Sequence, residues 1–232
     1  MDKVIIGIVA KHKKNNDTRT NGLIRDEVKQ AIFDNGAIAI AILSPNDKIQ
    51  YCGDDWKTCE QKIRTEEIIE QIKLCDGIIL QGGTENEAYE YWIAKYCYDN
   101  DIPVLGICAG QNYIVGALGG KTTLISNPEK HMRENDIYVH SIKILRNSKF
   151  YKIVGQEEIM VNSRHKRTVL ECPKLDKVAF DEDGHIEVVE AKNKSFYMGI
   201  RFHPESLYKV DKKMNNIFVE FIKMCANKKT QI

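Results

Sequence analysis

The sequence predicts an α/β protein with a mostly parallel central sheet and an antiparallel extension in the C-terminal half. Short apolar runs rich in β-branched residues alternate with amphipathic helical segments up to about Gly120, and this alternation is typical of βαβ units. After Gly120 the chain changes to shorter apolar segments separated by turn residues, which favours antiparallel pairing. The 232 residues are enough for one domain with its own core.

Four strands, each followed by a helix, are expected in the first half of the chain. The strands are near-continuous apolar runs, as in a parallel sheet that is covered on both faces. We place the strands at residues 4–10, 37–43, 77–80 and 103–107, the helices at 22–35, 58–74, 88–98 and 112–118, and polar connections at 11–21 and 44–55. Ligands bind outside the carboxyl ends of parallel strands, so Gly82 and Cys108 mark the edge where we expect the chemistry.

Shorter strands joined by turns are expected in the second half. We place the strands at residues 138–145, 158–162, 177–180, 186–191 and 196–202, with a hairpin-type turn at 181–185. An amphipathic helix over 212–225 follows, and the polar tail 226–232 is expected to fray. No repeat, low-complexity tract or linker divides the sequence. We therefore expect a single domain, 1–232.

Composition narrows the class of partner. Lysine and arginine total 34 against 33 aspartate and glutamate residues, so no strong net field favours nucleic acid or an anionic membrane. Seven cysteines without a CxxC pair argue against both a disulfide framework and a structural zinc site. With no signal-peptide pattern and no apolar run of spanning length, we expect a cytoplasmic protein that acts on a small molecule.

Leu105–Gln111 (LGICAGQ) is a candidate nucleophile elbow. It joins an expected strand to an expected helix, and Cys108 lies between Gly106 and Gly110. A tight strand-to-helix turn excludes bulky neighbours and places the sulfur at the helix N-terminus, which favours the thiolate. A buried structural cysteine is the competing interpretation, because free cysteine is among the most buried residue types. This stretch alone leaves both open.

His203 and Glu205 are a candidate base and its orienting carboxylate. They lie two residues apart after the expected strand 196–202, so their side chains share a face if the backbone stays extended. Pro204 restricts the backbone between them. A carboxylate on one imidazole nitrogen fixes the tautomer and leaves the other nitrogen to exchange a proton with a thiol. An exposed loop pair is the alternative for this motif by itself.

These motifs together resemble the class I glutamine amidotransferase-like superfamily. The closest resemblance is to its γ-glutamyl hydrolase branch (peptidase C26), which includes γ-glutamyl-γ-aminobutyrate hydrolase. The matching features, in the family's order, are Gln81–Gly83, Pro103–Gly110 with Gly119 and Gly120, His140 with Ile142 and Ser148, Val161–His165 (VNSRH), and Gly199–Glu205 (GIRFHPE). The fold that this resemblance implies is a flavodoxin-like three-layer sandwich.

The resemblance implies a catalytic triad of Cys108, His203 and Glu205. It also implies an oxyanion hole made by backbone N–H groups of Gly83 and Ala109. In the implied reaction the thiolate attacks a γ-glutamyl carbonyl, the amine leaves, and water releases glutamate from the thioester. No metal and no cofactor are needed for this chemistry.

The sequence departs from the family pattern around the expected substrate contacts. Glutamine is usual four residues after the nucleophile, but Asn112 stands there and Gln111 precedes it. We take as candidate substrate-binding residues Gln111, Asn112, Asn162, Ser163, His165 and Arg167. His165 is also interpreted as structural or as a support for the contacting residues.

Two charged stretches each have two functional interpretations. A basic patch of Arg164, Lys166 and Arg167 either selects a leaving group with a carboxylate or phosphate or is a solvated charge cluster, the interpretation we favour. Glu85 and Glu87 either meet an amine or start the following helix, where acidic residues are favoured. The helix start is the preferred interpretation.

Three functions are compatible with these residues. The leading hypothesis is a stand-alone hydrolase of γ-glutamyl amides. The alternative is a glutaminase subunit that delivers ammonia to a separate synthase, and a noncatalytic binding protein of the same fold is the third. The sequence does not identify the amine leaving group, whether free glutamine is a substrate, or whether the chain forms a homo-oligomer.

Overall fold

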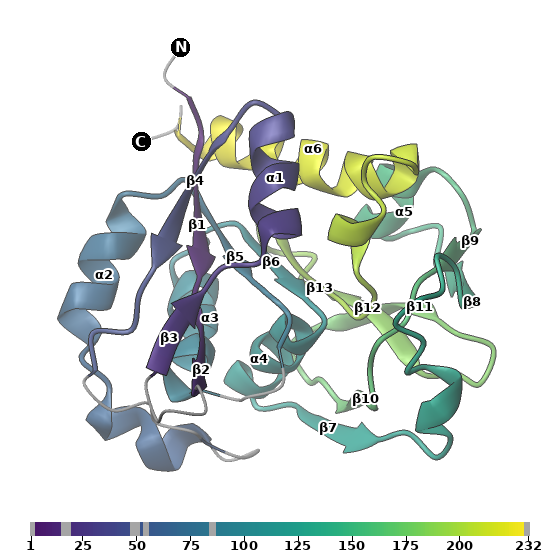
Figure 1. Ribbon diagram of the computed structural model, residues 1–232, viewed down its shortest axis with the longest axis horizontal. Helices are drawn as coiled ribbons and strands as arrows, with labels where there is room; N and C mark the ends of the chain where they lie inside the picture. Colours follow the sequence, from purple (N-terminus) through teal and green to yellow (C-terminus); the bar gives the residue numbers. More distant parts are fainter. Residues whose placement is uncertain (1–2, 15–19, 47–51, 53–55, 84–86, 230–232) are drawn as a thin grey trace.

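A nine-stranded sheet runs through the molecule (Figure 1). The computed structural model describes residues 3–14, 20–46, 52, 56–83 and 87–229. The strand order is β4 (Ile38–Ile42), β1 (Ile5–Val9), β5 (Gly77–Leu80), β6 (Val104–Ile107), β13 (Tyr197–Ile200), β12 (Ile186–Glu190), β11 (Asp176–Phe180), β8 (His140–Ile144) and β9 (Glu158–Val161). The first five strands are parallel and the last four pair antiparallel. This confirms the predicted mixed sheet and its C-terminal antiparallel extension.

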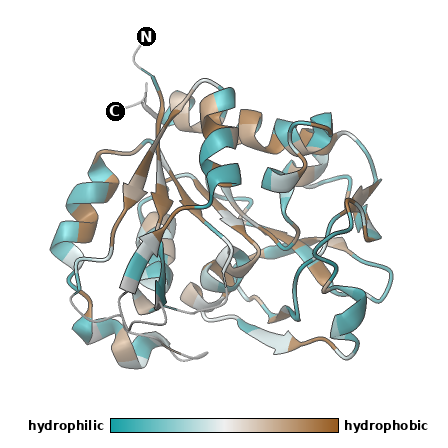
Figure 2. Cartoon of the chain, viewed as in Figure 1, coloured by the Kyte–Doolittle hydropathy of each residue, from teal (hydrophilic) through white to brown (hydrophobic). Residues whose placement is uncertain are grey.

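Helices cover both faces of the sheet and give the predicted three layers (Figure 1). One face carries α1 (Asp26–Asp34), α5 (Lys149–Val154) and α6 (Lys212–Lys229), and the other carries α2 (Thr65–Lys73), α3 (Ala88–Asp99) and α4 (Ala109–Ala117). Strand side chains alternate between the two resulting cores: in β5, Ile79 packs on the first face, and Ile78 and Leu80 on the second. In Figure 2 the central strands are largely hydrophobic, and the helices around them carry both hydrophilic and hydrophobic residues.

The first helix starts later than predicted. The sequence favoured a helix over 22–35, but Thr20–Leu23 forms strand β3, which pairs antiparallel with β2 (Lys11–Lys14). Helix α1 therefore begins at Asp26. Apolar residues such as Leu23 fit a helical spacing and a strand equally well, so the pairing partner decided the conformation.

The second helix is divided in two. The prediction of one helix over 58–74 was wrong, because the structure has a 3₁₀ helix η1 (Trp56–Lys62) followed by an extended Arg64 and then α2. Trp56 is buried, stacks on Tyr91 of α3 at 5.9 Å between ring centroids, and donates a hydrogen bond to the Gly116 carbonyl. These contacts hold η1 against α3 and α4. Of the connection expected at 44–55, residues 47–51 and 53–55 lie outside the described part.

Several short elements were not predicted. Strands β7 (Lys121–Leu124) and β10 (Arg167–Glu171) form a separate antiparallel pair, and α5 has Ser148 as its N-cap and Gly155, with φ 72°, as its C-cap.

Helix α6 continues to Lys229, so the expected fraying from 226 is not seen before that residue. Helix α4 starts at Ala109, three residues before the predicted helix. Among the described helices, none combines the length and apolar character that a membrane crossing requires.

Candidate active site

Cys108 occupies a strained turn between β6 and α4. Its backbone has φ 53° and ψ −104°, in a region that non-glycine residues rarely adopt. The turn is tight on both sides: a Cβ on Gly110 would lie 2.0 Å from the Leu80 carbonyl oxygen, and one on Gly106 would lie 2.7 Å from the Gly110 carbonyl oxygen. The expected elbow geometry is therefore present, with glycine required at both flanking positions.

His203 and Glu205 are in direct contact. His203 Nδ1 lies 2.7 Å from Glu205 Oε1, and both side chains are buried. The contact is not made along an extended strand, as the sequence suggested, because Pro204 begins the 3₁₀ helix η3 (Pro204–Ser206). This turn folds the carboxylate back onto the ring, and the other ring nitrogen is left to face Cys108.

Cys108 and His203 lie at the ends of neighbouring parallel strands. Strands β6 and β13 pair in register, and the Cys108 N–H donates to the Ile200 carbonyl at 2.7 Å. The Cys108 thiol and the His203 imidazole line the same cavity, and each shifts the pKa of the other. Cys108, His203 and Glu205 are thus brought together by the sheet register and one short turn.

The electrostatics of the pair favour charge separation. Burial by itself raises the pKa of the Cys108 thiol, but the positive charge and hydrogen bond of His203, with Arg201, outweigh burial and bring this pKa below its ordinary value. Burial likewise disfavours the charged form of His203, but Glu205 and Cys108 raise the pKa of its ring to about 10. The geometry therefore favours a thiolate–imidazolium pair at neutral pH.

Cys108 and His203 open into one cavity of about 380 Å³. Its other described lining residues are Arg25, Gly83, Met132, Glu134, Asn135 and Arg164. Two arginines and one glutamate therefore line the cavity into which Cys108 opens. Residues 84–86, which include Glu85, follow Gly83 directly and lie outside the described part.

The two expected oxyanion residues lie beside Cys108. Gly83 lines the cavity, and Ala109 is the first residue of α4, where helix N–H groups point outward. The neighbouring Gly82 also has a steric requirement, since a Cβ there would lie 3.3 Å from Cys108 Cβ and 3.2 Å from His203 Cε1. Their role as an oxyanion hole remains a prediction.

Gln81 and Glu87 support the loops around this edge. Gln81 is fully buried and accepts from the Arg25 backbone N–H while its amide donates to the Val9 and Leu23 carbonyls. The Glu87 backbone N–H donates to Glu90 Oε2 at 3.3 Å, so Glu87 is the N-cap of α3. This agrees with the preferred interpretation that Glu87 starts a helix.

Gln111 and Asn112 lie behind the nucleophile. Gln111 is completely buried, and its amide donates to the Glu187 and Gly199 carbonyls, both at 3.1 Å. Asn112 Oδ1 accepts from Arg201 Nη1 at 2.9 Å. In the described structure both side chains bind other parts of the protein rather than line the cavity, which argues against direct substrate contact.

The Asn162–Arg167 segment shows the same difference. Asn162 forms two hydrogen bonds with the backbone of His203, Ser163 is buried with its Oγ 3.4 Å from His131 Nδ1, and Arg167 Nε donates to Thr122 Oγ1 at 2.9 Å. His165 is buried, and its Nδ1 lies 3.1 Å from the Arg167 carbonyl oxygen. In the described structure these four side chains contact other parts of the protein, and substrate contact by them remains a prediction.

The basic patch does not act as one unit. Arg164 lines the cavity and donates to Ser206 Oγ at 3.2 Å, Lys166 is exposed, and Arg167 is held against β7. Of the three, Arg164 is therefore the residue placed to meet an anionic group at Cys108.

Two arginines of the site were not predicted from the sequence. Arg25 lines the cavity from the segment before α1, and its Nε donates to the Gly82 carbonyl at 3.3 Å. Arg201 is 1% exposed and donates to the Cys108 carbonyl at 3.3 Å. An arginine inside the apolar run 196–202 was a usable signal, because a buried arginine requires acceptors. Nothing in the local sequence marked Arg25.

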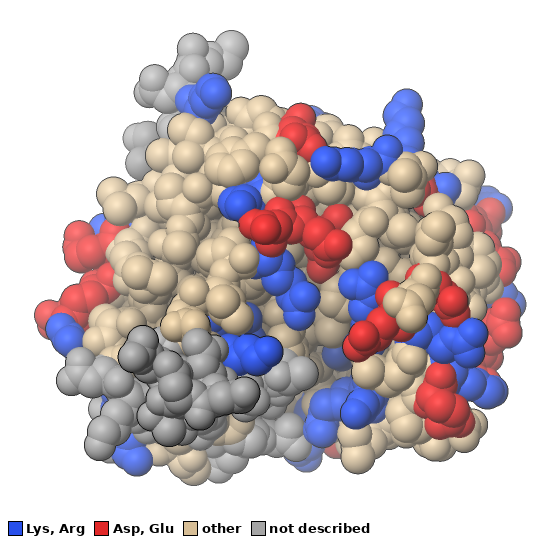
Figure 3. Space-filling model, viewed as in Figure 1, with Lys and Arg blue, Asp and Glu red and all other residues tan. Residues whose placement is uncertain are grey.

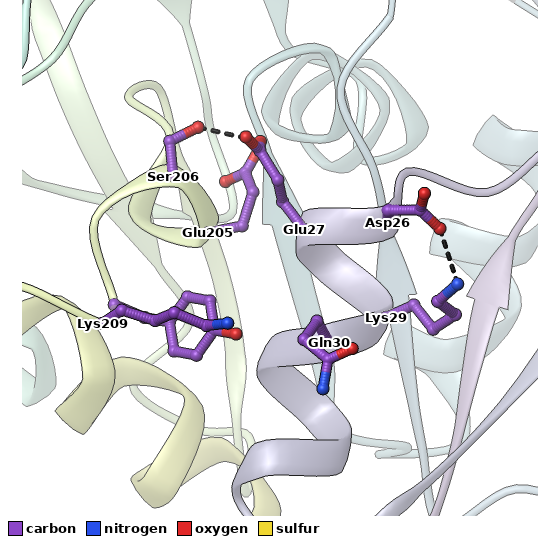
Figure 4. Close-up of a pocket in the computed structure, with 8 residues that line it drawn as sticks. Asp26, Glu27, Lys29, Gln30, Glu205, Ser206 and Lys209 are labelled. Carbon is purple, nitrogen blue, oxygen red and sulfur yellow. Dashed lines mark hydrogen bonds and ion pairs between the residues drawn. The ribbon is translucent and has the colours of Figure 1, made fainter.

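A second cavity, of about 450 Å³, lies behind Glu205 (Figure 4). It separates α1 from η3, and Ser206 Oγ donates across it to Glu27 Oε2 at 2.9 Å. Figure 3 shows acidic side chains gathered at the N-terminal end of α1, with basic side chains beside and below them. The carboxylate of Glu205 thus lies between the two cavities, facing His203 on one side.

Comparison with known proteins identifies the family. The Peptidase C26 family model matches residues 84–205. A glutamine-hydrolyzing GMP synthase subunit of Methanosphaera stadtmanae is 31% identical over 153 residues, covering 65% of this chain and 75% of the relative. CTP synthase of Chlamydia abortus is 28% identical over 187 residues, covering 66% of this chain but 35% of the relative. The chain thus spans about a third of that relative's length.

Solved structures share the fold. A protein assigned as a GMP synthase subunit from Thermoplasma acidophilum superposes with a TM-score of 0.67 at 17% identity, covering 100% of this chain and 98% of that one. The glutaminase domain of Trypanosoma brucei CTPS superposes with a TM-score of 0.65 at 17% identity, covering 97% and 94%. Together with the family match and the elbow at Cys108, these likenesses place the chain in the class I glutamine amidotransferase superfamily, as a member of the peptidase C26 family.

Proposed function

We propose that this chain hydrolyses γ-glutamyl amides and releases glutamate and an amine through a γ-glutamyl thioester on Cys108. The observation that carries the proposal is the array of Cys108 in a strained elbow, beside His203 at one cavity, with His203 Nδ1 2.7 Å from Glu205. Membership of a hydrolase family supports it. All three residues and both oxyanion groups belong to the one domain that we propose for residues 1–232.

The reaction follows from the ion pair. The Cys108 thiolate attacks the δ-carbonyl carbon of the γ-glutamyl group, and the carbonyl electron pair moves onto oxygen, beside the N–H groups of Gly83 and Ala109. Collapse of this intermediate breaks the C–N bond, and imidazolium His203 gives its proton to the leaving amine. Neutral His203 then takes a proton from water, whose oxygen attacks the thioester. Glutamate leaves, and thiolate and imidazolium are restored.

The charges around the cavity fit the glutamyl end of such a substrate. A γ-glutamyl group carries an α-carboxylate and an α-ammonium, and the cavity presents two cations, Arg25 and Arg164, and one anion, Glu134. A guanidinium binds a carboxylate bidentately. We propose that the arginines bind the α-carboxylate and that Glu134 faces the α-ammonium, which would orient the δ-carbonyl toward Cys108.

Glutamate release tests the proposal directly. Purified protein is incubated with free glutamine and with γ-glutamyl amides of neutral, acidic and cationic amines, and free glutamate is measured, with Cys108→Ala as the control. The expected result is glutamate release by the wild type from at least one amide and none by Cys108→Ala. Release from none of the amides, or equal release by Cys108→Ala, would remove this function.

A glutaminase subunit is the second candidate, and the relatives favour it. Several are glutamine-hydrolyzing GMP synthase subunits of similar size, including one from Methanocaldococcus jannaschii that is 29% identical over 85% of this chain and 97% of its own length. The chemistry at Cys108 would be the same, with ammonia as the leaving group and a separate synthase as the partner. Ammonia release from glutamine that rises when a synthase is added would select this candidate.

A further inference from the structure

Three histidines and a glutamate converge on one point away from Cys108. His131 follows the 3₁₀ helix η2 (Pro128–Lys130), His140 begins β8, His165 lies between β9 and β10, and Glu187 is in β12. One ligand atom from each residue lies within 4.8 Å of the others. His131 and His165 are 4% exposed and Glu187 is fully buried. Four separate segments thus bring nitrogen and carboxylate groups into the interior.

The orientation of two rings leaves lone pairs facing a carboxylate. His165 Nδ1 lies 3.1 Å from the Arg167 carbonyl oxygen and His140 Nδ1 lies 3.3 Å from the Ser141 carbonyl oxygen, so each Nδ1 is the protonated nitrogen. In the neutral rings, Nε2 is then an acceptor. These two Nε2 atoms lie 3.3 Å and 3.9 Å from Glu187 Oε1.

This arrangement leaves several buried acceptor atoms without a donor. Within the described residues, Nε2 of His140, Nε2 of His165 and both carboxylate oxygens of Glu187 are buried without a hydrogen-bond partner. Arg201 is the nearby fixed charge, but its Nε and Nη2 likewise lack a hydrogen bond there and do not satisfy the carboxylate. Buried acceptors that face one another cost free energy unless a proton or a metal ion lies between them.

The donor set and spacing suit a transition metal. Imidazole and carboxylate are ligands for zinc, and bonds of about 2.0–2.1 Å to a tetrahedral ion place ligand atoms about 3.3 Å apart. The His165–Glu187 separation is 3.3 Å and the His140–Glu187 separation is 3.9 Å, so His140 would move closer when an ion binds. Metal-binding histidines almost always donate the other ring N–H to a carbonyl or carboxylate, as His140 and His165 do here. We propose that His131, His140, His165 and Glu187 bind one divalent transition-metal ion, with zinc the best match.

The site would be structural and would brace one wall of the catalytic cavity. Four protein ligands close the coordination of a tetrahedral ion, as in structural zinc sites. His131 directly precedes Met132, and His165 directly follows Arg164, and both neighbours line the cavity at Cys108. A metal that ties His131 to His165 would therefore fix the two segments that carry these residues. The proposal does not depend on the reaction proposed for Cys108.

Metal binding is measured in the full chain carrying Cys108→Ala, because the Cys108–His203 pair is itself able to bind a soft metal. Chelator-treated protein is titrated with Zn²⁺ and, separately, with Co²⁺. The expected result is about one tightly bound ion per chain, a higher Tm with Zn²⁺, and a visible Co²⁺ spectrum of a tetrahedral site without thiolate charge transfer.

Variants assign the ligands. His140→Asn changes the most accessible of the four ligands, and Glu187→Gln keeps the shape of a buried one; each is expected to weaken Zn²⁺ binding at least about tenfold. His12→Asn is the control, because His12 pairs with Glu87 and belongs to neither group of candidate metal ligands among the described residues. Circular dichroism of the metal-free variants checks folding. Failure of the parent to retain Zn²⁺, undiminished binding by both ligand variants, or an equal loss in His12→Asn would overturn the proposal.

Discussion

The side chain of Asn162 pairs with the backbone of His203 through two hydrogen bonds. Asn162 Nδ2 donates to the His203 carbonyl at 2.9 Å, and the His203 N–H donates to Asn162 Oδ1 at 2.7 Å. All the groups involved are buried. The amide thus takes the place of a neighbouring strand just beyond the end of β13 and fixes the backbone from which the imidazole reaches Cys108.

Asn162→Ala is expected to lower kcat while leaving KM nearly unchanged. It leaves a buried N–H and a buried carbonyl without partners, which costs about 2–4 kcal/mol of stability, and it frees the His203 backbone to shift. We expect kcat to fall at least about tenfold, since small displacements of a catalytic group are costly. Asn100→Ala, at the exposed end of α3, is the control. A rise in KM without a fall in kcat would instead restore the substrate-contact interpretation of Asn162.

Much of the fold could be predicted from the sequence because it depends on local patterns. The buried parallel strands appear in the sequence as apolar runs, and the glycines around Cys108 mark a turn with no room for side chains. The hairpin of β2 and β3 could not be predicted, because its short strands depend on pairing rather than on periodicity. The division of the second helix likewise depends on Trp56, whose partners on α3 and α4 are far away in the sequence.

The candidate active site likewise has one part that could be predicted from the sequence and one part that could not. Cys108, His203 and Glu205 are placed by strand ends and one turn, so motif spacing was sufficient to bring them together. The sequence could not decide the roles of the polar residues between Gln111 and Arg167. A polar residue near a catalytic motif binds either the ligand or other parts of the protein. Gln111 and Asn162 serve the scaffold, as their backbone hydrogen bonds show.

Cys108 is expected to react with iodoacetamide well below the pH at which ordinary thiols react. Its pKa is lowered although burial opposes this, because His203 and Arg201 favour the thiolate. Alkylation therefore persists as pH falls below the usual thiol range and is lost only near the lowered pKa. Burial raises the pKa of Cys52 and Cys75 to about 12, so peptide mapping at pH 7 should find the label mainly on Cys108.

The matched variant for this alkylation measurement is His203→Ala. Without the positive charge of the imidazolium, burial disfavours the thiolate more strongly, so the pKa of Cys108 rises. The midpoint of the alkylation profile should therefore move to higher pH. An unchanged midpoint would show that His203 does not stabilise the thiolate.

Glu205→Gln is expected to move the alkaline limb of the pH–rate profile to lower pH. Burial lowers the pKa of His203, and the charges of Glu205 and Cys108 raise it to about 10. Removing one of these charges lowers that pKa, so the imidazolium that we propose as the proton donor to the leaving amine is lost earlier as pH rises. We also expect kcat to fall at least about a hundredfold. The measurement is kcat/KM against pH; an unmoved alkaline limb would contradict the contact's role.

Arg164→Ala is expected to raise KM for γ-glutamyl substrates about 10–100-fold, the equivalent of one charge-assisted hydrogen bond. Arg164 lines the cavity at Cys108, whereas Lys166, two residues on, is exposed and does not line it. Lys166→Ala is therefore the matched control and should leave KM unchanged. Equal effects of the two substitutions on acidic substrates would favour a diffuse electrostatic attraction over a specific contact with Arg164.

Gly110→Ala is expected to destabilise the protein because the elbow has no space for one methyl group. The added Cβ would lie 2.0 Å from the Leu80 carbonyl oxygen, a backbone atom of a central strand that cannot rotate away. We expect a loss of about 3 kcal/mol or more, which corresponds to a fall in Tm of about 6–12 °C for a chain of this size. At Gly22 the nearest atom to an added Cβ is 3.9 Å away, so Gly22→Ala should leave Tm nearly unchanged. If the two variants melted at the same temperature, the packing of α4 against β5 would be looser than the structure shows, and Cys108 would no longer be held at its strained φ by contact with that strand.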